Sequence, residues 1–204
     1  GLYSENLYMC SLSNMESWNN TGRGFYFGGY STSINAKRCW AGGDAAYPSG
    51  GNQSDGWHIE DTVYSVFESC SSDWNNGIGW LLQNVNGISL IGCGSESNKK
   101  EGFVAETTAA AAAINSVSGL KFTSCFGYNN SQLTVDGYAN FLRITTAASR
   151  PAKVTVDTAV SLLTASTVKD YVFAGTSGAI DIYEINNNIT GTVTSSGTVT
   201  RHIL

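Results

Sequence analysis

The stretch Gly56-Trp57-His58-Ile59-Glu60, followed by Ser65-Val66-Phe67-Glu68-Ser69-Cys70, recurs along the first two thirds of the chain. The same combination of a glycine, a bulky apolar residue and a later cysteine occurs at Gly24-Phe25 to Cys39, Gly79-Trp80 to Cys93 and, with extra residues inserted, Gly102-Phe103 to Cys125. Gly56 and Gly79 are 23 residues apart, and so are Gly79 and Gly102. Self-similarity at this period predicts a solenoid, in which each repeat buries its apolar face only by stacking on its neighbours.

Each repeat contains two short segments in which apolar residues alternate, the period-2 pattern of strands with one buried face. In the first segment the inward positions are Phe25 and Phe27, Trp57 and Ile59, Trp80 and Leu82, and Phe103 and Ala105. In the second they are Ile34, Ala36 and Cys39; Ser65, Phe67 and Cys70; Ile88, Leu90 and Cys93; and Leu120, Phe122 and Cys125. The pattern predicts an all-β fold, a right-handed single-stranded parallel β-helix with a modified C-terminal β region.

The repeat is regular over residues 1–130, and residues 131–204 still contain strand-like segments separated by Gly, Asn and Ser. We expect this second part to form either terminal turns of the solenoid or a separate C-terminal β module. Two insertions, between Trp40 and Asp55 and between Thr107 and Ser116, interrupt the period, and insertions in a solenoid often gather on its binding face. Gly1-Leu2-Tyr3 begins in phase with the repeat, which suggests a fragment of a longer solenoid.

Composition argues against several classes of function. Lys and Arg number 11 against 16 Asp and Glu, a net charge of −5, with no basic run, so neither nucleic acid nor membrane insertion is expected. Four of the five cysteines, Cys39, Cys70, Cys93 and Cys125, occupy the same position in successive repeats. This arrangement favours buried, reduced thiols over disulfides. No Cys or His spacing typical of zinc occurs, and we expect neither a metal nor a cofactor.

An acidic column is expected on the outer face of the first strands, at Glu5, Gly28, Glu60, Gln83 and Glu106. Glu60 and Glu106 would lie two strands apart with Gln83 between them, about 9 to 10 Å at the backbone. Inverting glycosidases separate their two carboxyl groups by about 6.5 to 9.5 Å. We therefore name Glu60 and Glu106 as candidate catalytic residues, and the neighbouring Gln83, His58, Asp55 and Asp61 as candidate substrate contacts. The alternative is that these side chains form only a solvated acidic face.

Aromatic residues at outward or loop positions add Trp40 and Trp74 to the candidate substrate-binding residues, since aromatic faces stack on sugar rings. Such residues also suit subunit interfaces. Leu81, Val104, Val66 and Ile91 alternate outward as well and predict an exposed apolar stripe that a partner would cover.

The repeat that runs from Gly56-Trp57-His58-Ile59-Glu60 to Cys70, and its copy from Gly79 to Cys93, resemble the turns of bacteriophage tailspikes, within the wider group of pectate-lyase-like β-helices. The resemblance covers residues 1 to about 130. It implies a homotrimer on the phage tail, outside the host cell, that binds and depolymerises a bacterial surface polysaccharide, either capsule or O-antigen. A polysaccharide lyase is an alternative to a hydrolase, although the calcium-binding Asp cluster and catalytic Arg of pectate lyases have no match here. A non-catalytic receptor-binding adhesin and a structural trimeric shaft are further alternatives.

Overall fold

The structure is a computed structural model that describes residues 1–43, 51–108, 116–133, 139–146, 150–162, 169–175, 179–185, 193–196 and 198–204. Within these ranges the chain is all-β, with strands joined by turns and no helix. Among the same residues no helix is long and apolar enough to cross a membrane.

The strands form three sheets in which every pairing is parallel, and the chain visits the sheets in turn. The first sheet contains β1 (Leu2–Glu5), β4 (Phe25–Gly28), β7 (Trp57–Glu60), β10 (Trp80–Gln83), β13 (Phe103–Thr107), β16 (Ala139–Thr146), β19 (Lys169–Gly175) and β21 (Val193–Ser196). The second contains β2 (Ser11–Ser13), β5 (Asn35–Lys37), β8 (Val66–Glu68), β11 (Ser89–Ile91), β14 (Leu120–Thr123), β17 (Ala152–Asp157), β20 (Ile180–Ile185) and β22 (Val199–Ile203). The third contains β3 (Glu16–Ser17), β6 (Trp40–Gly42), β9 (Ser71–Asp73), β12 (Gly94–Glu96), β15 (Phe126–Tyr128) and β18 (Val160–Leu162).

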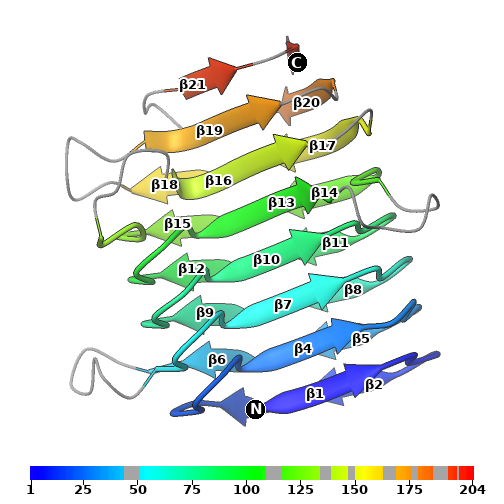
Figure 1. Cartoon of the computed structure of the whole chain (residues 1–204), viewed down its shortest axis with the longest axis vertical. Helices are drawn as coiled ribbons and strands as arrows, with labels where there is room; N and C mark the ends of the chain where they lie inside the picture. The colour runs from blue at the N-terminus through cyan, green and yellow to red at the C-terminus, as the bar shows by residue number, and fades with distance from the viewer. Residues whose placement is uncertain are drawn as a thin grey trace.

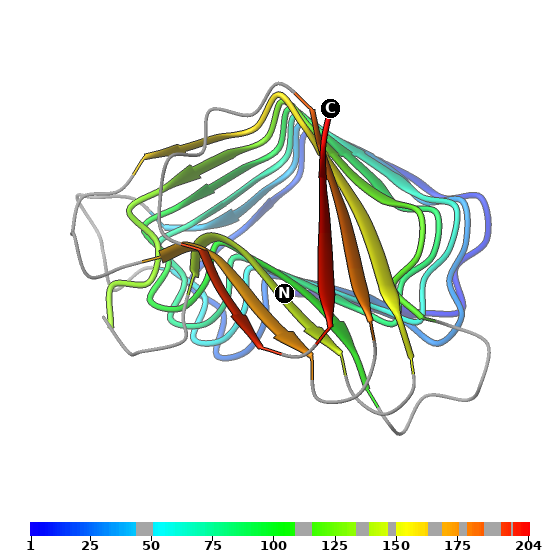
Figure 2. The same cartoon turned by 90° about the horizontal axis from the view of Figure 1, so that it is seen from above.

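We call one strand from each sheet, taken in chain order, a rung. The rungs stack from the N-terminus at the bottom of Figure 1 to the C-terminus at its top. Seen along the stack in Figure 2, the three sheets form the sides of a triangle. The spatial neighbours of a residue are therefore the equivalent residues in the rungs below and above it.

The interior is filled as the alternation predicts. All eight inward residues of the first strands are fully buried, and those of the second strands are at most 1 % exposed. The Trp57 ring stacks on Phe25 at 4.1 Å and on Trp80 at 4.6 Å between centroids. Each indole also satisfies its polar group, because Trp57 Nε1 donates to the Ser71 carbonyl and Trp80 Nε1 to the Gly94 carbonyl.

The repeat cysteines form one interior column and are free thiols, which confirms the prediction of buried, reduced cysteines. Three of these thiols donate to carbonyls of the rung below: Cys70 to Ala36 at 3.5 Å, Cys93 to Phe67 at 3.3 Å and Cys125 to Leu90 at 3.4 Å. Cys10, at the base of the stack, is partly exposed. The column therefore acts as small apolar packing with satisfied S–H groups.

A second interior column consists of asparagines at the corner between the third and first sheets: Asn52, Asn75, Asn98, Asn130 and Asn140. Serines beside it bond the repeat glycines, as when Ser95 Oγ donates to the Gly102 carbonyl at 3.0 Å. The glycines leave room for this network, since a Cβ on Gly79 would lie 2.2 Å from Ser95 Oγ. The glycine of the repeat is thus required by packing against polar side chains.

Strands beyond residue 130 extend the same sheets, because β16 pairs with β13, β17 with β14 and β18 with β15. In the described part of the chain the third sheet ends at β18, whereas the other two continue to β21 and β22. Part of the first predicted insertion, residues 44–50, and most of the second, residues 109–115, lie outside the described residues.

Candidate functional site

The outer face of the first sheet carries the predicted column of polar side chains. Glu60 is paired in register with Gln83, and Gln83 with Glu106, so the predicted register is confirmed. Glu60 and Glu106 are therefore two rungs apart, about 9 to 10 Å at the backbone. The Glu60 side chain is 32 % exposed, and Gln83 and Glu106 are half-buried, so all three side chains reach solvent.

Each carboxylate of this column is held by a neighbour. Gln83 Nε2 donates to Glu106 Oε1 at 2.5 Å, and the Tyr26 hydroxyl donates to Glu60 Oε2 at 3.0 Å. Burial, and then the hydrogen bond to Glu60, raise the pKa of Tyr26, so this phenol stays protonated and remains a donor. Hydrogen bonds from Tyr26 and Gln83 thus orient the carboxyl groups of Glu60 and Glu106, and both groups remain accessible to solvent.

His58 lies behind Glu60, between two carboxylates. Its Nε2 is 3.7 Å from Glu60 Oε2, and its Nδ1 is 3.7 Å from Asp55 Oδ2. These distances exceed hydrogen-bonding range, and neither ring nitrogen has a hydrogen-bond partner in the described structure. The His58 side chain is only 6 % exposed, so it is placed to orient Glu60 and offers a sugar almost no surface.

Asp55 is fixed by the backbone of the next rung, since its Oδ1 accepts a hydrogen bond from the Ile78 N–H at 3.0 Å. Its Oδ2 lies 3.8 Å from Arg23 Nε. Asp61 directly follows β7 at a left-handed corner, with φ of 46°, and is half-buried. The structure therefore brings Asp55, His58 and Glu60 together, with Asp61 beside them.

Trp40 and Trp74 lie elsewhere. Trp40 is in β6 of the third sheet, and Trp74 follows β9 of that sheet at a left-handed corner, so neither lies in the first sheet with Glu60. Alternation within one strand indicates whether a side chain points in or out, but it does not assign residues to one of three sheets.

Beside Trp40 the third sheet holds a carboxylate pair that the sequence analysis did not identify. Asp73 and Glu96 are register partners in β9 and β12, and Trp40 Nε1 donates to Asp73 Oδ2 at 2.6 Å. Burial, with a smaller contribution from the charge of Glu96, raises the pKa of Asp73 from 3.8 to about 6. A signal was present in the sequence, because each of these acids stands three residues after a repeat cysteine, Cys70 or Cys93.

The predicted exposed apolar stripe is wrong for two of its four members, and a third, Val66, is half-buried. Leu81 is 8 % exposed and Val104 is fully buried, and both pack with Ile78 in a small cluster on the outer face. Arg143 is the register partner of Val104 and lies 3.0 Å from the buried carboxylate of Glu101. Only Ile91, at 40 %, is clearly exposed. The outward direction was predicted correctly, but neighbouring side chains on the same face cover these two residues.

Across the described ranges, no group of three or more His, Cys, Asp or Glu side chains is arranged to hold a metal ion. The chain matches no family model, no curated protein and no solved structure with which it was compared.

Proposed function

We propose that this chain is a right-handed parallel β-helix of the tailspike kind that binds and hydrolyses a bacterial surface polysaccharide. One observation carries the proposal, namely the register that aligns Glu60, Gln83 and Glu106 on an outer sheet face. The backbone spacing of the two acids, together with side chains that can lean toward each other, is compatible with the separation of carboxyl groups in inverting glycosidases.

In the proposed reaction one glutamate is the general acid and the other the general base. Glu106, which accepts the Gln83 amide, takes a proton from a water molecule, and that water oxygen bonds to the anomeric carbon. Glu60 gives its proton to the glycosidic oxygen as the bond from that oxygen to the anomeric carbon breaks. The Tyr26 hydroxyl holds Glu60 in place, and the long contact of His58 with Glu60, at 3.7 Å, can tighten when a sugar excludes water from the site.

Three variants test the proposal, each with polysaccharide from a susceptible bacterial strain as substrate and polymer size as the measurement. Glu60→Gln and Glu106→Gln keep side-chain size but remove the acid, and each should lower turnover by at least about a hundredfold while binding survives. Glu68→Gln is the matched control, because Glu68 is an exposed carboxylate on the second sheet that pairs with Lys37 at 2.8 Å. Full activity in both active-site variants would eliminate this pair.

The carboxylate pair on the third sheet provides the second arm of this experiment. If Asp73→Asn abolishes depolymerisation while Glu60→Gln and Glu106→Gln do not, the reaction belongs to the third sheet. If the unaltered chain binds the polymer without shortening it, the protein is an adhesin; if it neither binds nor cleaves, it is a structural shaft.

The homotrimer and the location on a phage tail remain part of this proposal through the resemblance alone. Leu81 and Val104 are covered by neighbouring side chains, so they offer a trimer no exposed apolar surface. Light scattering, with an apparent mass three times that of the monomer as the expected result, tests the assembly.

A further inference from the structure

The outer face of the third sheet has an aromatic ring at each side of a short stretch of small residues. Trp40, in β6, is the register partner of Ser71, Ser71 is that of Gly94, and Gly94 is that of Phe126. Trp40 and Phe126 are therefore three strands apart, about 14 Å at the backbone. All four residues are half-buried, as expected for positions that point away from the interior of the triangle in Figure 2.

The two positions between these rings carry very little side chain. A Cβ on Gly94 would meet no described atom closer than 3.8 Å, and the nearest is the Ser71 Cβ. Neither the Trp40 indole nor the Phe126 ring therefore folds over Gly94. The Phe126 ring packs instead beside Tyr128 of its own strand, with 6.2 Å between centroids and 17° between the planes. The described face is thus open over two strands, with an aromatic wall at each side.

Two carboxylates run along one edge of this open stretch. Asp73 and Glu96 are register partners on adjacent strands, and Glu96 is also the register partner of Tyr128. The Trp40 indole donates to Asp73, which fixes the Trp40 ring beside the acid. Burial, and to a smaller extent the charge of Glu96, raises the pKa of Asp73 to about 6, so the two carboxylates repel each other when both are ionised.

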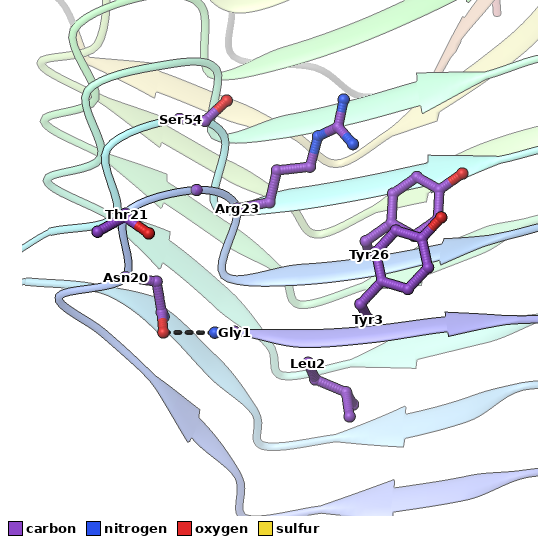
Figure 3. A pocket seen from close by; sticks show the side chains of 9 residues that line it. Gly1, Leu2, Tyr3, Asn20, Thr21, Arg23, Tyr26 and Ser54 are labelled. Atoms are coloured by element: carbon purple, nitrogen blue, oxygen red, sulfur yellow. Dashed lines mark hydrogen bonds between the residues drawn. The ribbon is translucent and has the colours of Figure 1, made fainter.

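The two carboxylates have no basic partner among the described residues. Beside the first sheet, Asp55 has Arg23 at 3.8 Å, and Figure 3 shows Arg23 next to the Tyr26 ring at the wall of a pocket. In the described ranges neither Asp73 nor Glu96 forms an ion pair with any Lys or Arg side chain. The third-sheet face therefore combines uncompensated negative charge with aromatic rings, and both attract an organic cation.

We propose that this face of the third sheet binds a sugar unit that carries a free ammonium group. The ammonium lies between Asp73 and Glu96, and the sugar ring lies over Gly94, between the two aromatic walls. A pyranose suits this open floor because its apolar face packs on aromatic rings, while the ammonium relieves the repulsion between adjacent carboxylates. The inference rests on the proposed function, and it narrows the polysaccharide to one with free amines. The site is on a different sheet from the proposed catalytic column.

The test measures binding of small ligands to the full chain at pH 7 by NMR chemical-shift titration. The probes are the methyl glycosides of glucosamine and galactosamine, with their N-acetylated forms as neutral counterparts. At least one amino glycoside should bind about tenfold or more tightly than its N-acetylated form, because hydrogen bonds to charged groups are stronger than those between neutral groups. The shifts should include the Trp40 indole N–H. Equal affinity for both forms would overturn the inference, and so would equally tight binding of Nα-acetyllysine amide, which would point to a basic protein segment.

Variants separate charge from packing, and melting temperatures show that each variant is folded. Glu96→Gln should abolish the preference for the amino glycoside, whereas Phe126→Leu should weaken the amino and N-acetylated forms alike. Gly94→Leu should block both, because its side chain would occupy the open floor. Glu68→Gln is the matched control, since Glu68 is an exposed carboxylate on the second sheet. An unchanged preference in Glu96→Gln, or undiminished binding in Gly94→Leu, would contradict the site.

The pH dependence of binding gives a further readout. On β6, β9 and β12 the only titratable side chains are Asp73 and Glu96. Lowering the pH from 7 to 5 should weaken binding of the amino glycoside, because Asp73, with a pKa of about 6, takes up a proton while the sugar amine keeps its charge. Asp73→Asn should reduce this dependence. The same affinity at both pH values would place the ammonium away from Asp73 and overturn the inference.

The outcome is distinguishable from failure of the proposed hydrolysis. If the amino glycoside binds through Glu96 but no polymer is shortened, the third-sheet site stands and the catalytic assignment falls. If the chain shortens a polymer without free amines and shows no preference for amino glycosides, the hydrolase stands and the third-sheet site falls.

Discussion

The side chain of Asn75 donates to the side chain of Asn98 one rung above it, with 2.9 Å between Nδ2 and Oδ1. The same oxygen of Asn98 also accepts the backbone N–H of Asn75 at 3.0 Å. Asn98 in turn donates to the Ser72 carbonyl and to Asn130 Oδ1. Both polar atoms of the buried Asn98 side-chain amide therefore make hydrogen bonds. At this corner between the third and first sheets, such side-chain hydrogen bonds connect successive rungs where strand pairing is interrupted.

Replacement of Asn98 by alanine should destabilise the protein by on the order of 3 kcal/mol or more. The change leaves the buried backbone N–H of Asn75 without its acceptor, which costs about 1–3 kcal/mol, and it also removes the hydrogen bonds that the Asn98 side chain makes to Asn75, Ser72 and Asn130, at about 1 kcal/mol each. Chemical denaturation measures the loss. The control is Asn76→Ala, because the Asn76 amide bonds Gln53 at the surface and its loss should cost less than about 1 kcal/mol. Equal stability of the two variants would contradict the role assigned to the column.

The repeat glycine Gly79 and Gly94, which lies outside the repeat position, should differ sharply in their tolerance of alanine. A Cβ on Gly79 would lie 2.2 Å from Ser95 Oγ and 2.5 Å from the Gly102 carbonyl, so Gly79→Ala should cost about 1–3 kcal/mol through overpacking. A Cβ on Gly94 would meet nothing closer than 3.8 Å, and Gly94→Ala should change stability by less than about 0.5 kcal/mol. If the two substitutions cost the same, the packing reason for the repeat glycine is wrong.

The stacking of the rungs could be predicted from the sequence, because the same apolar pattern recurs in each repeat. It did not reveal the asparagine column, although Asn75, Asn98 and Asn130 each stand five residues after a repeat cysteine. Asparagine in a turn is ordinarily assigned to solvent, since its side chain suits exposed turns. Only the stacking of successive rungs shows that these amides face one another inside the corner.

The candidate site was predictable in part for a similar reason. Register along one column follows from the repeat period, and it placed Glu60, Gln83 and Glu106 correctly relative to one another. The repeat period does not predict how far each side chain is buried, because burial depends on the neighbouring side chains on the same face of the sheet. The alternation therefore did not predict that His58 is buried, nor that burial raises the pKa of Asp73.

Reaction of the native protein with a thiol reagent should be fast at one cysteine and slow at four. Cys10 is partly exposed, whereas Cys39, Cys70, Cys93 and Cys125 are buried. Burial raises the pKa of Cys125 to about 12 and that of Cys93 well above its ordinary value, so little thiolate is available in either. Cys10→Ser should remove the fast phase, and denaturant should expose the other four. Several fast thiols in the native state would contradict the interior column.

Ionisation of Asp73 should lower the free energy of unfolding as the pH rises from about 4 to about 6. Burial raises its pKa from 3.8 to about 6, so between these values the folded state binds the proton more tightly than the unfolded state does. By linkage, unfolding then becomes easier as the pH rises, and the penalty is complete above about 6. Asp73→Asn stays neutral and keeps an oxygen that can accept the Trp40 indole, so it removes the penalty and little else.

Thermal denaturation of the two proteins from pH 4 to pH 7.5 measures this effect. The midpoint of Asp73→Asn should be close to that of the unaltered chain near pH 4, rise above it up to about pH 6 and keep a constant lead beyond. Glu68→Gln serves as the control, because its exposed carboxylate should give a difference that does not grow over this interval. A constant difference for Asp73→Asn over the whole range would show that the carboxyl group of Asp73 titrates normally, and would also weaken its candidacy as a general acid in the third-sheet pair.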